Sequence, residues 1–293
     1  MDFLRPTSWA EALEAKAAHP GAVPIAGGTD VMVELNFDRH RPEALLDLNQ
    51  VTELQQWAED GTRIRLGAGV TYTRIIEELG DPLPGLAMAS RTVGSPQIRN
   101  RGTVAGNLGA ASPAGDAHPP LLATGAEIRV ASTRGTRTLR AEDFYTGVKR
   151  NALEPDELIE AVVLEKAKGP QQFAKIGTRN AMVISVAAFA IALDPEAGTV
   201  GTGIGSAAPT PRRARDAETF LAGELAAHGL WETRGAIPDS ITREFGERVR
   251  QAASPIDDVR GTAAYRLHSL AVMARRTLGW AWADLQNDQR KAS

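Results

Sequence analysis

The chain contains two stretches rich in small residues, PIAGGTD at residues 24–30 and TVAGNLGAASPAGD at residues 103–116. Glycine and alanine let backbone N–H groups approach a bulky anion, and successive amides in a tight turn form a concave site for phosphate oxygens. Each stretch also carries hydroxyl, amide or carboxylate groups that can bind a diphosphate and its sugar hydroxyls. Two such stretches in one chain predict a dinucleotide clamped between them.

Each stretch also has a plainer interpretation. The glycine pair at residues 27–28 is equally typical of an ordinary turn between a strand and a helix. The second stretch is more unusual, because three glycines, several alanines, Asn107 and Asp116 fall within fourteen residues. A chain rarely places so many small residues together unless a ligand or partner approaches its backbone closely. Taken together, the two stretches favour ligand binding over plain turns.

A third glycine-containing stretch, GTGIG at residues 201–205, has part of the spacing of a dinucleotide-binding fingerprint. Ser206 stands where that fingerprint needs its third glycine, and the stretch falls within an expected strand instead of opening a helix. We therefore expect a flexible or bulged strand here. No Walker-type glycine–lysine motif occurs, so nothing supports nucleoside triphosphate hydrolysis.

Composition limits the function further. The 293 residues are 43% hydrophobic and 24% charged, which is typical of a globular protein with room for two domains. A net charge of −3 argues against nucleic-acid binding. The absence of cysteine excludes disulfides and thiolate-ligated iron–sulfur clusters in this chain. The five histidines lack metal-site spacing, so we expect no metal site, and no nucleophile–base pair can be placed, so we assign no catalytic residue.

The opening residues lack the apolar core of a signal peptide, and the longest apolar run, residues 181–193, is too short to span a bilayer. We therefore expect a cytoplasmic protein with no membrane insertion. The hydrophobic pattern predicts a helix over residues 8–19 capped by Ser8, strands at 23–26, 44–48, 63–66, 127–131 and 158–164, and helices at 71–79 and 86–93. It also predicts a hairpin of 181–193 with 199–206, and a last helix over 262–280.

A charged, turn-rich segment at residues 166–170 predicts a domain boundary. We expect a first domain over residues 1–168, with lobes of about 1–55 and 56–168, and a second domain over 169–287. Residues 288–293 are expected to form a disordered tail.

The two small-residue stretches resemble the flavin-binding signatures of the FAD (medium) subunit of molybdenum hydroxylases, the xanthine dehydrogenase family. Five further segments resemble this family in the same order and at similar spacing. These segments are SPQIRN at 95–100, FYTG at 144–147, ELI at 157–159, FAKIGTR at 173–179 and DDVRGTAAYR at 257–266. The likeness covers essentially the whole chain, and the ordered set is far more specific than any single piece.

The resemblance implies an α+β fold. A two-lobed FAD-binding domain of the para-cresol methylhydroxylase and vanillyl-alcohol oxidase type would be followed by a smaller domain of antiparallel sheet and helices, like the carbon monoxide dehydrogenase flavoprotein C-terminal domain. It also implies an electron-transfer subunit of a heteromeric complex. Electrons would pass from 2Fe–2S clusters through FAD to NAD or another acceptor, with molybdopterin and the clusters on partner subunits. The absence of cysteine agrees with this division.

The resemblance also implies which residues line the FAD. The first stretch would contact the diphosphate, the second would form the opposite wall, Asp116 would accept a hydrogen bond from a ribityl or ribose hydroxyl, and Lys175 would lie near the flavin. The implied cofactor-binding residues are Pro24, Ile25, Ala26, Gly27, Gly28, Thr29, Asp30, Val31, Thr103, Val104, Ala105, Gly106, Asn107, Asp116, Ile159 and Lys175. An exposed strand lysine is the alternative interpretation of Lys175.

Some positions depart from the family pattern. Ala105 stands where relatives usually have glycine, Val148 where many have tyrosine, and Val183 at a place often held by aspartate. These departures bear on flavin potential and acceptor access, not on FAD binding itself. Two alternative functions stay open at this point: an independent flavin oxidase or dehydrogenase with its own substrate, and a scaffold subunit that keeps the fold without flavin.

Overall fold

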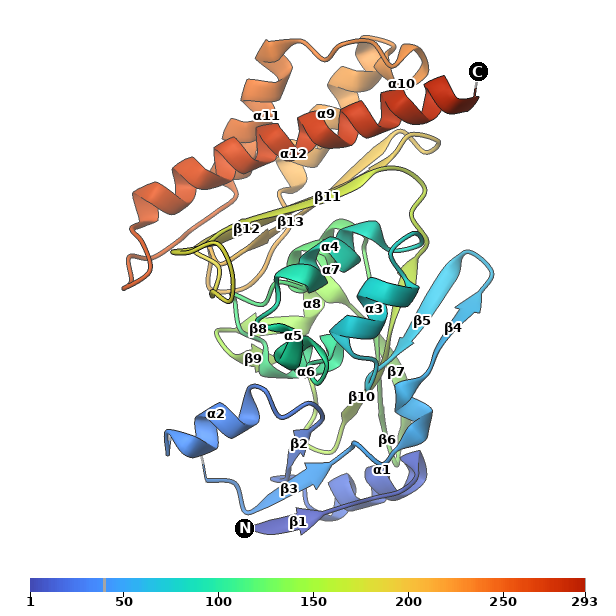
Figure 1. The fold of residues 1–293 in the computed structure, drawn as a ribbon, viewed down its shortest axis with the longest axis vertical. Helices are drawn as coiled ribbons and strands as arrows, with labels where there is room; N and C mark the ends of the chain where they lie inside the picture. Colours follow the sequence, from blue (N-terminus) through green and yellow to red (C-terminus); the bar gives the residue numbers. More distant parts are fainter. Residues whose placement is uncertain (39–40, 293) are drawn as a thin grey trace.

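The computed structural model describes residues 1–38 and 41–292. Three units are stacked along its longest axis (Figure 1). We call residues 1–55, at the bottom, lobe 1, residues 56–165, in the middle, lobe 2, and the residues from the strand at Gln171 onwards, at the top, the C-terminal domain. The arrangement is the α+β fold that the sequence predicts.

Lobe 1 is built on a parallel sheet with the strand order β1-β3-β2. Its elements are β1 (Asp2–Leu4), α1 (Trp9–Ala18), β2 (Val23–Ile25), α2 (Val31–Asn36), β3 (Ala44–Asp47) and η1 (Thr52–Gln55). Helix α1 begins as predicted, because the Ser8 hydroxyl accepts a hydrogen bond from the N–H of Glu11. Since β2 and β3 are parallel, their carboxyl ends open at one edge of the sheet, where the first small-residue stretch begins.

Lobe 2 contains an antiparallel sheet with the strand order β4-β5-β10-β6-β7. Its strands are β4 (Trp57–Asp60), β5 (Arg63–Gly67), β6 (Glu127–Ser132), β7 (Gly135–Arg140) and β10 (Leu158–Glu165), with a small hairpin of β8 (Tyr145–Gly147) and β9 (Arg150–Asn151). Its helices are α3 (Tyr72–Glu78), α4 (Pro84–Thr92), α5 (Pro96–Arg99), α6 (Val104–Ala110), α7 (His118–Ala123) and α8 (Ala141–Phe144). One continuous hydrophobic core joins lobe 2 to lobe 1.

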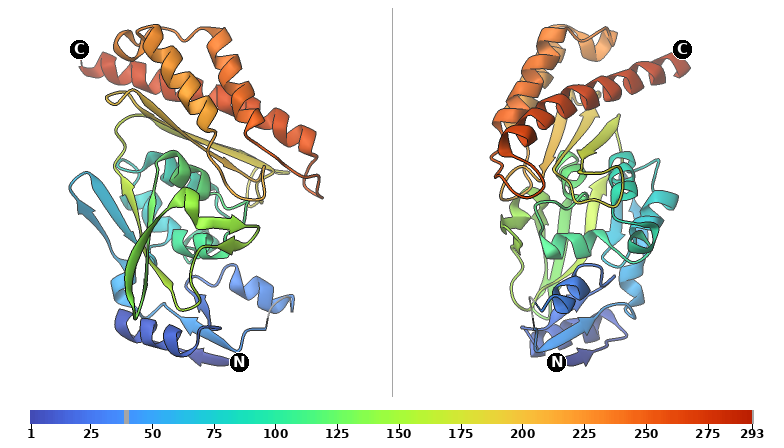
Figure 2. Two further views of the ribbon diagram at one scale, coloured as in Figure 1. Left: turned by 180° about the vertical axis from the view of Figure 1, so that it is seen from behind. Right: turned by 60° about the vertical axis from the view of Figure 1, so that its left-hand side comes forward.

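The C-terminal domain has a three-stranded antiparallel sheet and four helices. These elements are β11 (Gln171–Ile176), β12 (Ala187–Asp194), β13 (Thr199–Gly205), α9 (Arg215–Ala227), α10 (Leu230–Thr233), α11 (Asp239–Gln251) and α12 (Ala263–Ala292). Helices α9 and α12 pack on one face of the sheet, while α4 and α7 of lobe 2 pack on the other, so the sheet lies between two helical layers (Figures 1 and 2).

Strand β13 contains the glycines of the GTGIG stretch, and the structure explains them. A Cβ atom on Gly201 or Gly203 would lie less than 3.0 Å from the carbonyl oxygen of Ala123 or Pro119 in α7, closer than real Cβ atoms come. The expectation of a bulge is wrong, because β13 pairs residue for residue with β12 over residues 199–205. The glycines instead let α7 lie directly on the sheet.

The structure also corrects three other expectations. The second small-residue stretch, where we expected amides in a tight turn, instead forms the helix α6 over residues 104–110. Strand β12 begins at Ala187, six residues later than predicted, and Met182 in the preceding loop has a φ of 49°. Helix α12 continues past Trp280 to Ala292, through most of the expected tail, because neither glycine nor proline occurs after Gly279. No helix in the described part of the chain is both long and apolar enough to cross a membrane.

Candidate functional site

A cavity of about 220 Å³ lies between lobe 1 and lobe 2, and both small-residue stretches line it. Its walls include Ala26 and Gly27 from the first stretch and Thr103 from the second, as the sequence predicts for a clamp. The other lining residues are Leu48, Asn49, Leu54, Gln55, Ala68, Gly69, Thr71, Arg74, Asn100 and Arg101. Pockets that bury a whole small ligand measure roughly 300–1,000 Å³, so this cavity can enclose one part of a dinucleotide.

The two adjacent glycines of the first stretch serve different purposes. A Cβ on Gly27 would lie less than 3.0 Å from the backbone carbonyl of Arg101, so this glycine is where the two lobes touch through their main chains. Gly28 has open space by comparison, with its nearest neighbours at 3.4 Å, but its φ of +73° lies in the left-handed region that favours glycine. The first glycine therefore permits close approach, and the second permits the turn.

Several backbone amides around this cavity lack a partner within the chain. Among the described residues, the N–H groups of Gly27, Gly28 and Thr29 donate no hydrogen bond to the backbone, and neither does that of Ala105 in the first turn of α6. Thr103 caps that helix by accepting a bond of 2.9 Å from the Gly106 N–H. Such unpartnered donors, brought together from two lobes, match the acceptor oxygens of a diphosphate.

The cavity contains a polar residue that sequence reasoning missed. The Asn49 side chain donates to the Ala26 carbonyl at 2.8 Å and accepts from Arg101 at 3.2 Å, so it ties lobe 1 to the loop before α6. Asn49 lies two residues after β3, at the carboxyl edge that β3 shares with β2. Ligands of open α/β sheets bind at the carboxyl edge of the strands, so the position of Asn49 just after a predicted strand could have identified it as a site residue.

Asp30 precedes α2 but its side chain makes no capping hydrogen bond. Burial raises the pKa of Asp30 above its ordinary value, and the neighbouring Glu34 carboxylate adds to this effect, while Lys149 opposes it. A carboxyl group with a raised pKa is more easily neutral, so it repels a nearby phosphate less than an ordinary aspartate would. The environment of Asp30 is therefore compatible with its predicted place beside a diphosphate.

Lys175 and Asp116 meet in a buried ion pair between the C-terminal domain and lobe 2. The Lys175 ammonium lies 2.5 Å from Asp116 Oδ2 and also donates to the carbonyls of Thr92 and Val183. Asp116 accepts two further bonds, from the hydroxyls of Ser185 at 2.5 Å and Thr92 at 3.0 Å. The side chains are 11% and 8% exposed, so the alternative of an exposed strand lysine is wrong. Contact of this pair with FAD stays a prediction.

We expect Lys175→Met to destabilise the apo chain by about 3–5 kcal/mol, because it leaves the Asp116 carboxylate buried without its counter-charge. Urea unfolding of the two chains measures the difference. The double variant Asp116→Asn with Lys175→Met should recover part of the loss, since it removes the unpaired charge. Equal losses in the single and double variants would show that the uncompensated charge of Asp116 is not the cause of the loss.

The remaining predicted residues are distributed around the same region. Pro24 and Ile25 belong to β2, and Val31 opens α2. Ile159 is buried in β10 as part of the core of lobes 1 and 2, next to a shift in the register between β10 and β6. Gly106 and Asn107 lie within the short helix α6.

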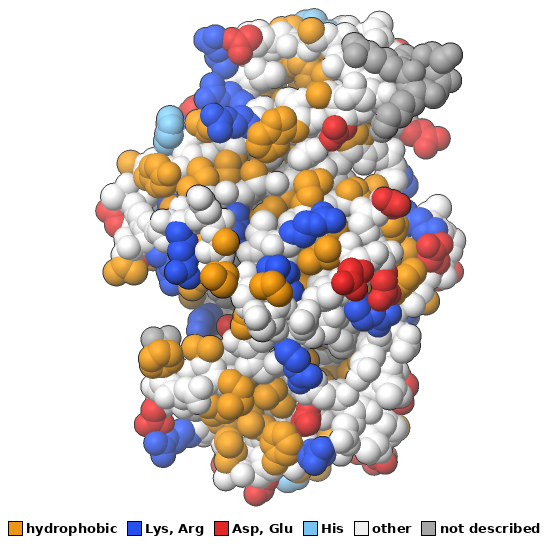
Figure 3. Space-filling model, viewed as in Figure 1, with side chains coloured by type: hydrophobic (Ala, Val, Ile, Leu, Met, Phe, Trp, Pro, Cys, Tyr) orange, Lys and Arg blue, Asp and Glu red, His pale blue; other side chains and the backbone are white. Residues whose placement is uncertain are grey.

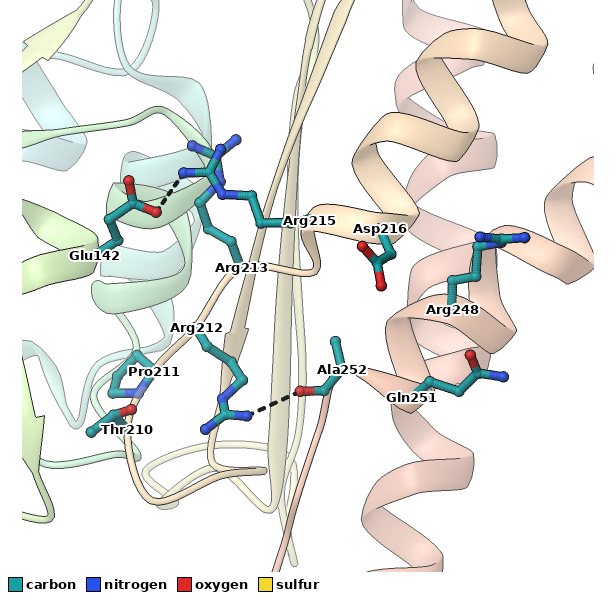
Figure 4. Close-up of a pocket in the computed structure, with 10 residues that line it drawn as sticks. All are labelled: Glu142, Thr210, Pro211, Arg212, Arg213, Arg215, Asp216, Arg248, Gln251 and Ala252. Atoms are coloured by element: carbon teal, nitrogen blue, oxygen red, sulfur yellow. Dashed lines mark hydrogen bonds and ion pairs between the residues drawn. The ribbon is translucent and has the colours of Figure 1, made fainter.

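A second and larger cavity, of about 500 Å³, lies where α8 faces the C-terminal domain (Figure 4). Four arginines line it, and each has a partner in the chain. Arg212 donates to the Ala252 carbonyl, Arg213 pairs with Glu218, Arg215 pairs with Glu142, and Arg248 pairs with Glu244. In Figure 4 the ends of Arg213 and Arg215 lie together near Glu142, while Arg212 and Arg248 point away from them, so the four do not converge on one point. The cavity does not form a dedicated anion site.

His118, the first residue of α7, is fully buried and its Nδ1 lies 2.8 Å from the Tyr145 hydroxyl. Burial lowers the pKa of His118 to about 3, so the folded chain holds the ring neutral. The unfolded chain binds the proton near the ordinary pKa of about 6.5. The free energy of unfolding should therefore fall, through this residue, by about 1.4 kcal/mol per pH unit as the pH drops from about 6.5 towards 3.

Unfolding by urea at a series of pH values tests this expectation. The variant His118→Phe cannot take up the proton, so its stability should depend less steeply on pH below about 6.5, even if its stability at pH 7 is lower. Parallel pH profiles for the two chains would contradict the assignment.

Comparisons with known proteins agree with this geometry. A family model described as "FAD binding domain in molybdopterin dehydrogenase" matches residues 1–165, and one described as "CO dehydrogenase flavoprotein C-terminal domain" matches residues 172–281. The chain is 30% identical to a xanthine dehydrogenase FAD-binding subunit of Escherichia coli over 96% of both chains. It is 29% identical to the carbon monoxide dehydrogenase medium chain of Afipia carboxidovorans over 98% of both.

Solved structures show the same fold. A chain of carbon monoxide dehydrogenase from Hydrogenophaga pseudoflava superposes with a TM-score of 0.88 at 26% identity, covering 97% of this chain and 98% of that one. A chain of the reconstituted carbon monoxide dehydrogenase from Oligotropha carboxidovorans gives the same TM-score at 28% identity, with the same coverage.

Proposed function

The chain belongs to the family of the FAD-binding domain in molybdopterin dehydrogenases, and we propose that it holds FAD in the cleft between lobe 1 and lobe 2 as the electron-transfer subunit of a molybdenum hydroxylase complex. The observation that carries this proposal is the meeting of two small-residue stretches, with unpartnered amides, at one cavity. Gly27, Gly28 and Thr29 would bind the diphosphate from one side. The first turn of α6 would bind it from the other.

The bound flavin would supply the redox chemistry by taking up and releasing electrons. The residues of this chain would bind and orient it, and would exclude water from part of the cleft. The described residues contain no cluster of three or more His, Asp or Glu side chains that could hold a metal ion, and the sequence has no cysteine. Molybdopterin and 2Fe–2S clusters would therefore reside on partner subunits, and electrons would pass from those clusters through FAD to NAD or another acceptor.

Partner subunits would need an exposed surface on which to dock. Lobe 1 exposes several large hydrophobic side chains, Phe3, Met32, Val33 and Phe37. Figure 3 shows hydrophobic side chains gathered on this part of the molecule. Large exposed apolar patches are rare on monomeric proteins and often mark sites of interaction with other proteins. The exposed side chains of lobe 1 therefore support assembly with other chains.

Reconstitution of the purified chain with FAD tests the proposal. We expect one FAD per chain, with the visible absorbance of an oxidised flavin after the free cofactor is removed. Failure to take up FAD would leave the flavin-free scaffold as the better explanation. Steady turnover of an alcohol or aldehyde by the isolated, FAD-loaded chain would instead favour the independent flavin oxidase.

Purification of the chain from cells that produce its native partners tests the proposed complex. We expect it to elute with an iron–sulfur subunit and a molybdopterin subunit. In that complex the flavin should bleach when the molybdenum site is given its substrate. A flavin that stays oxidised while the iron–sulfur clusters become reduced would contradict the proposed electron path.

A further inference from the structure

A cluster of buried polar atoms lies directly behind the second small-residue stretch, and the binding of phosphate by backbone amides does not account for it. The ring of His118 is fully buried, and its Nε2 has no hydrogen-bond partner that meets the geometric limits. The side-chain oxygen Oδ1 of Asn107 in α6 is buried in the same way, also without a partner. Buried polar atoms are rarely left unpaired, so each of these atoms needs an explanation.

Gly115 shows that these two atoms lie close together. A Cβ atom placed on Gly115 would be less than 3.0 Å from both His118 Nε2 and Asn107 Oδ1. Both atoms therefore border the space beside Gly115 that the Cβ atom of any other residue would occupy. The His118 ring and the Asn107 amide thus face each other across the space that Gly115 leaves open.

The surroundings of the ring decide which nitrogen carries the proton. Asn107 Oδ1, which can only accept a hydrogen bond, lies on the Nε2 side of the ring. A neutral imidazole has one donor and one acceptor nitrogen, so Nε2 must be the donor. Nδ1 is then the acceptor, and it takes the proton of the Tyr145 hydroxyl at 2.8 Å. The polarity therefore runs in one direction: Tyr145 donates to His118 Nδ1, and the Nε2 donor faces Asn107 Oδ1 across the gap at Gly115 without a hydrogen bond between them.

The orientation of the Asn107 amide also determines where its amino group lies. With Oδ1 turned towards His118, the amino group Nδ2 points the other way. Nδ2 makes no hydrogen bond within the described chain, and it is not among the fully buried unpartnered atoms, in a residue that is partly exposed. Asn107 is one helical turn from Thr103, which lines the cavity between the lobes. Asn107 itself does not line that cavity, so its amino group would reach bound FAD only where the cofactor extends beyond the cavity.

The geometry points to His118 as a positioning residue that holds the Asn107 amide with its amino group facing the cleft, where it donates a hydrogen bond to an oxygen or ring-nitrogen acceptor of bound FAD. This inference rests on the proposed function, and it adds a residue outside the sixteen implied by the family resemblance. Without the ring, the amide could turn over and offer its oxygen to the cofactor, which would repel a phosphate or carbonyl oxygen. His118 therefore acts through Asn107 and does not touch FAD.

A double-mutant cycle on FAD affinity tests the arrangement. We expect His118→Phe and Asn107→Ala each to raise the dissociation constant of FAD about tenfold, the range of one hydrogen bond. The double variant should bind no more weakly than Asn107→Ala alone, because His118 acts only through that amide. The matched control is His228→Phe, a half-exposed histidine at the end of α9, which should bind FAD like the wild type.

Two outcomes would overturn the inference while leaving the proposed function intact. One is tight FAD binding by His118→Phe, and the other is losses that add in full in the double variant, which would indicate general destabilisation. A wild-type chain that fails to bind FAD would instead defeat the proposed function itself.

Nitrogen-15 NMR of the apo chain provides a readout that needs neither FAD nor a folded His118 variant. The His118 signals are identified by their shift in Tyr145→Phe. We expect a neutral ring that carries its proton on Nε2 and does not titrate between about pH 5 and pH 8. A ring protonated on Nδ1 would reverse the direction of the hydrogen bonds and contradict the inference.

Discussion

Replacing Gly27 by alanine is expected to weaken FAD binding by at least about 100-fold, or about 3 kcal/mol. The new methyl group would lie less than 3.0 Å from the carbonyl oxygen of Arg101, which is backbone and cannot move aside as a flexible side chain can. The two lobes would therefore have to separate at the point where their small-residue stretches meet. The amides of the first stretch and those of α6 would no longer face the same ligand. Titration of the apo variant with FAD, followed by flavin fluorescence, measures the loss.

Gly28→Ala is the matched control for this prediction. It adds the same methyl group one residue later, where the nearest atoms are at 3.4 Å, so no segment is pushed away. Its cost comes from the positive φ and amounts to about 1–2 kcal/mol. We expect FAD binding to weaken about tenfold or less. If the two variants bind FAD equally well, the contact between the lobes does not set the geometry of the cleft.

Replacing Gly203 by alanine is expected to destabilise the chain by about 3 kcal/mol, at the upper end of the range for overpacking a core. The added methyl group would collide with the carbonyl oxygen of Pro119 in α7, so β13 and α7 would have to move apart. This movement would also disturb the small interface cluster around Phe173 and Ala188. Differential scanning calorimetry should show a lower melting temperature, with the single transition broadened or divided as the C-terminal domain separates from lobe 2.

Gly223→Ala is the control for this second prediction. Gly223 lies on an exposed face of α9 in the same domain, and an added Cβ would meet no atom within 4 Å. Alanine should stabilise the helix there by about 0.5–1 kcal/mol. A Gly203→Ala chain that melts like the wild type would show that the close approach of α7 to the sheet is not needed for stability.

Much of the site could be predicted from residue chemistry. The parallel strands β2 and β3 place the first small-residue stretch at one edge of their sheet. The second stretch was expected to face the first because one large anion could contact both. Thr103 was placed in the site as part of the second stretch, and in the structure it caps α6 and lines the cavity. The helical state of residues 104–110 could not be predicted, because two glycines in seven residues weaken helix formation. Packing of Val104 and Leu108 in the core outweighs that preference.

Long-range pairings were the part that could not be predicted. Glycines in β13 indicate that something approaches closely, but the pattern does not say that α7, eighty residues earlier in the chain, is the segment that does so. We predicted that Asp116 accepts a hydrogen bond from a hydroxyl of FAD, because a carboxylate beside a diphosphate needs a hydrogen-bond donor. The structure supplies donors from the protein, at Lys175 and Ser185, fifty-nine and sixty-nine residues away. Only the assembled fold brings these groups together.

The pairing of Asp116 with Lys175 has a consequence for how the protein matures as it is synthesised. Lobes 1 and 2 share one core and leave the ribosome first, but the charge of Asp116 gains its partner only when β11 docks. The sheet that contains β11 is covered by α12, which is synthesised after it, so the C-terminal domain can dock fully only once α12 has been made. A nascent chain therefore completes the surroundings of Asp116 late, and we expect a chain truncated before α12 to leave this aspartate solvated beside folded lobes 1 and 2.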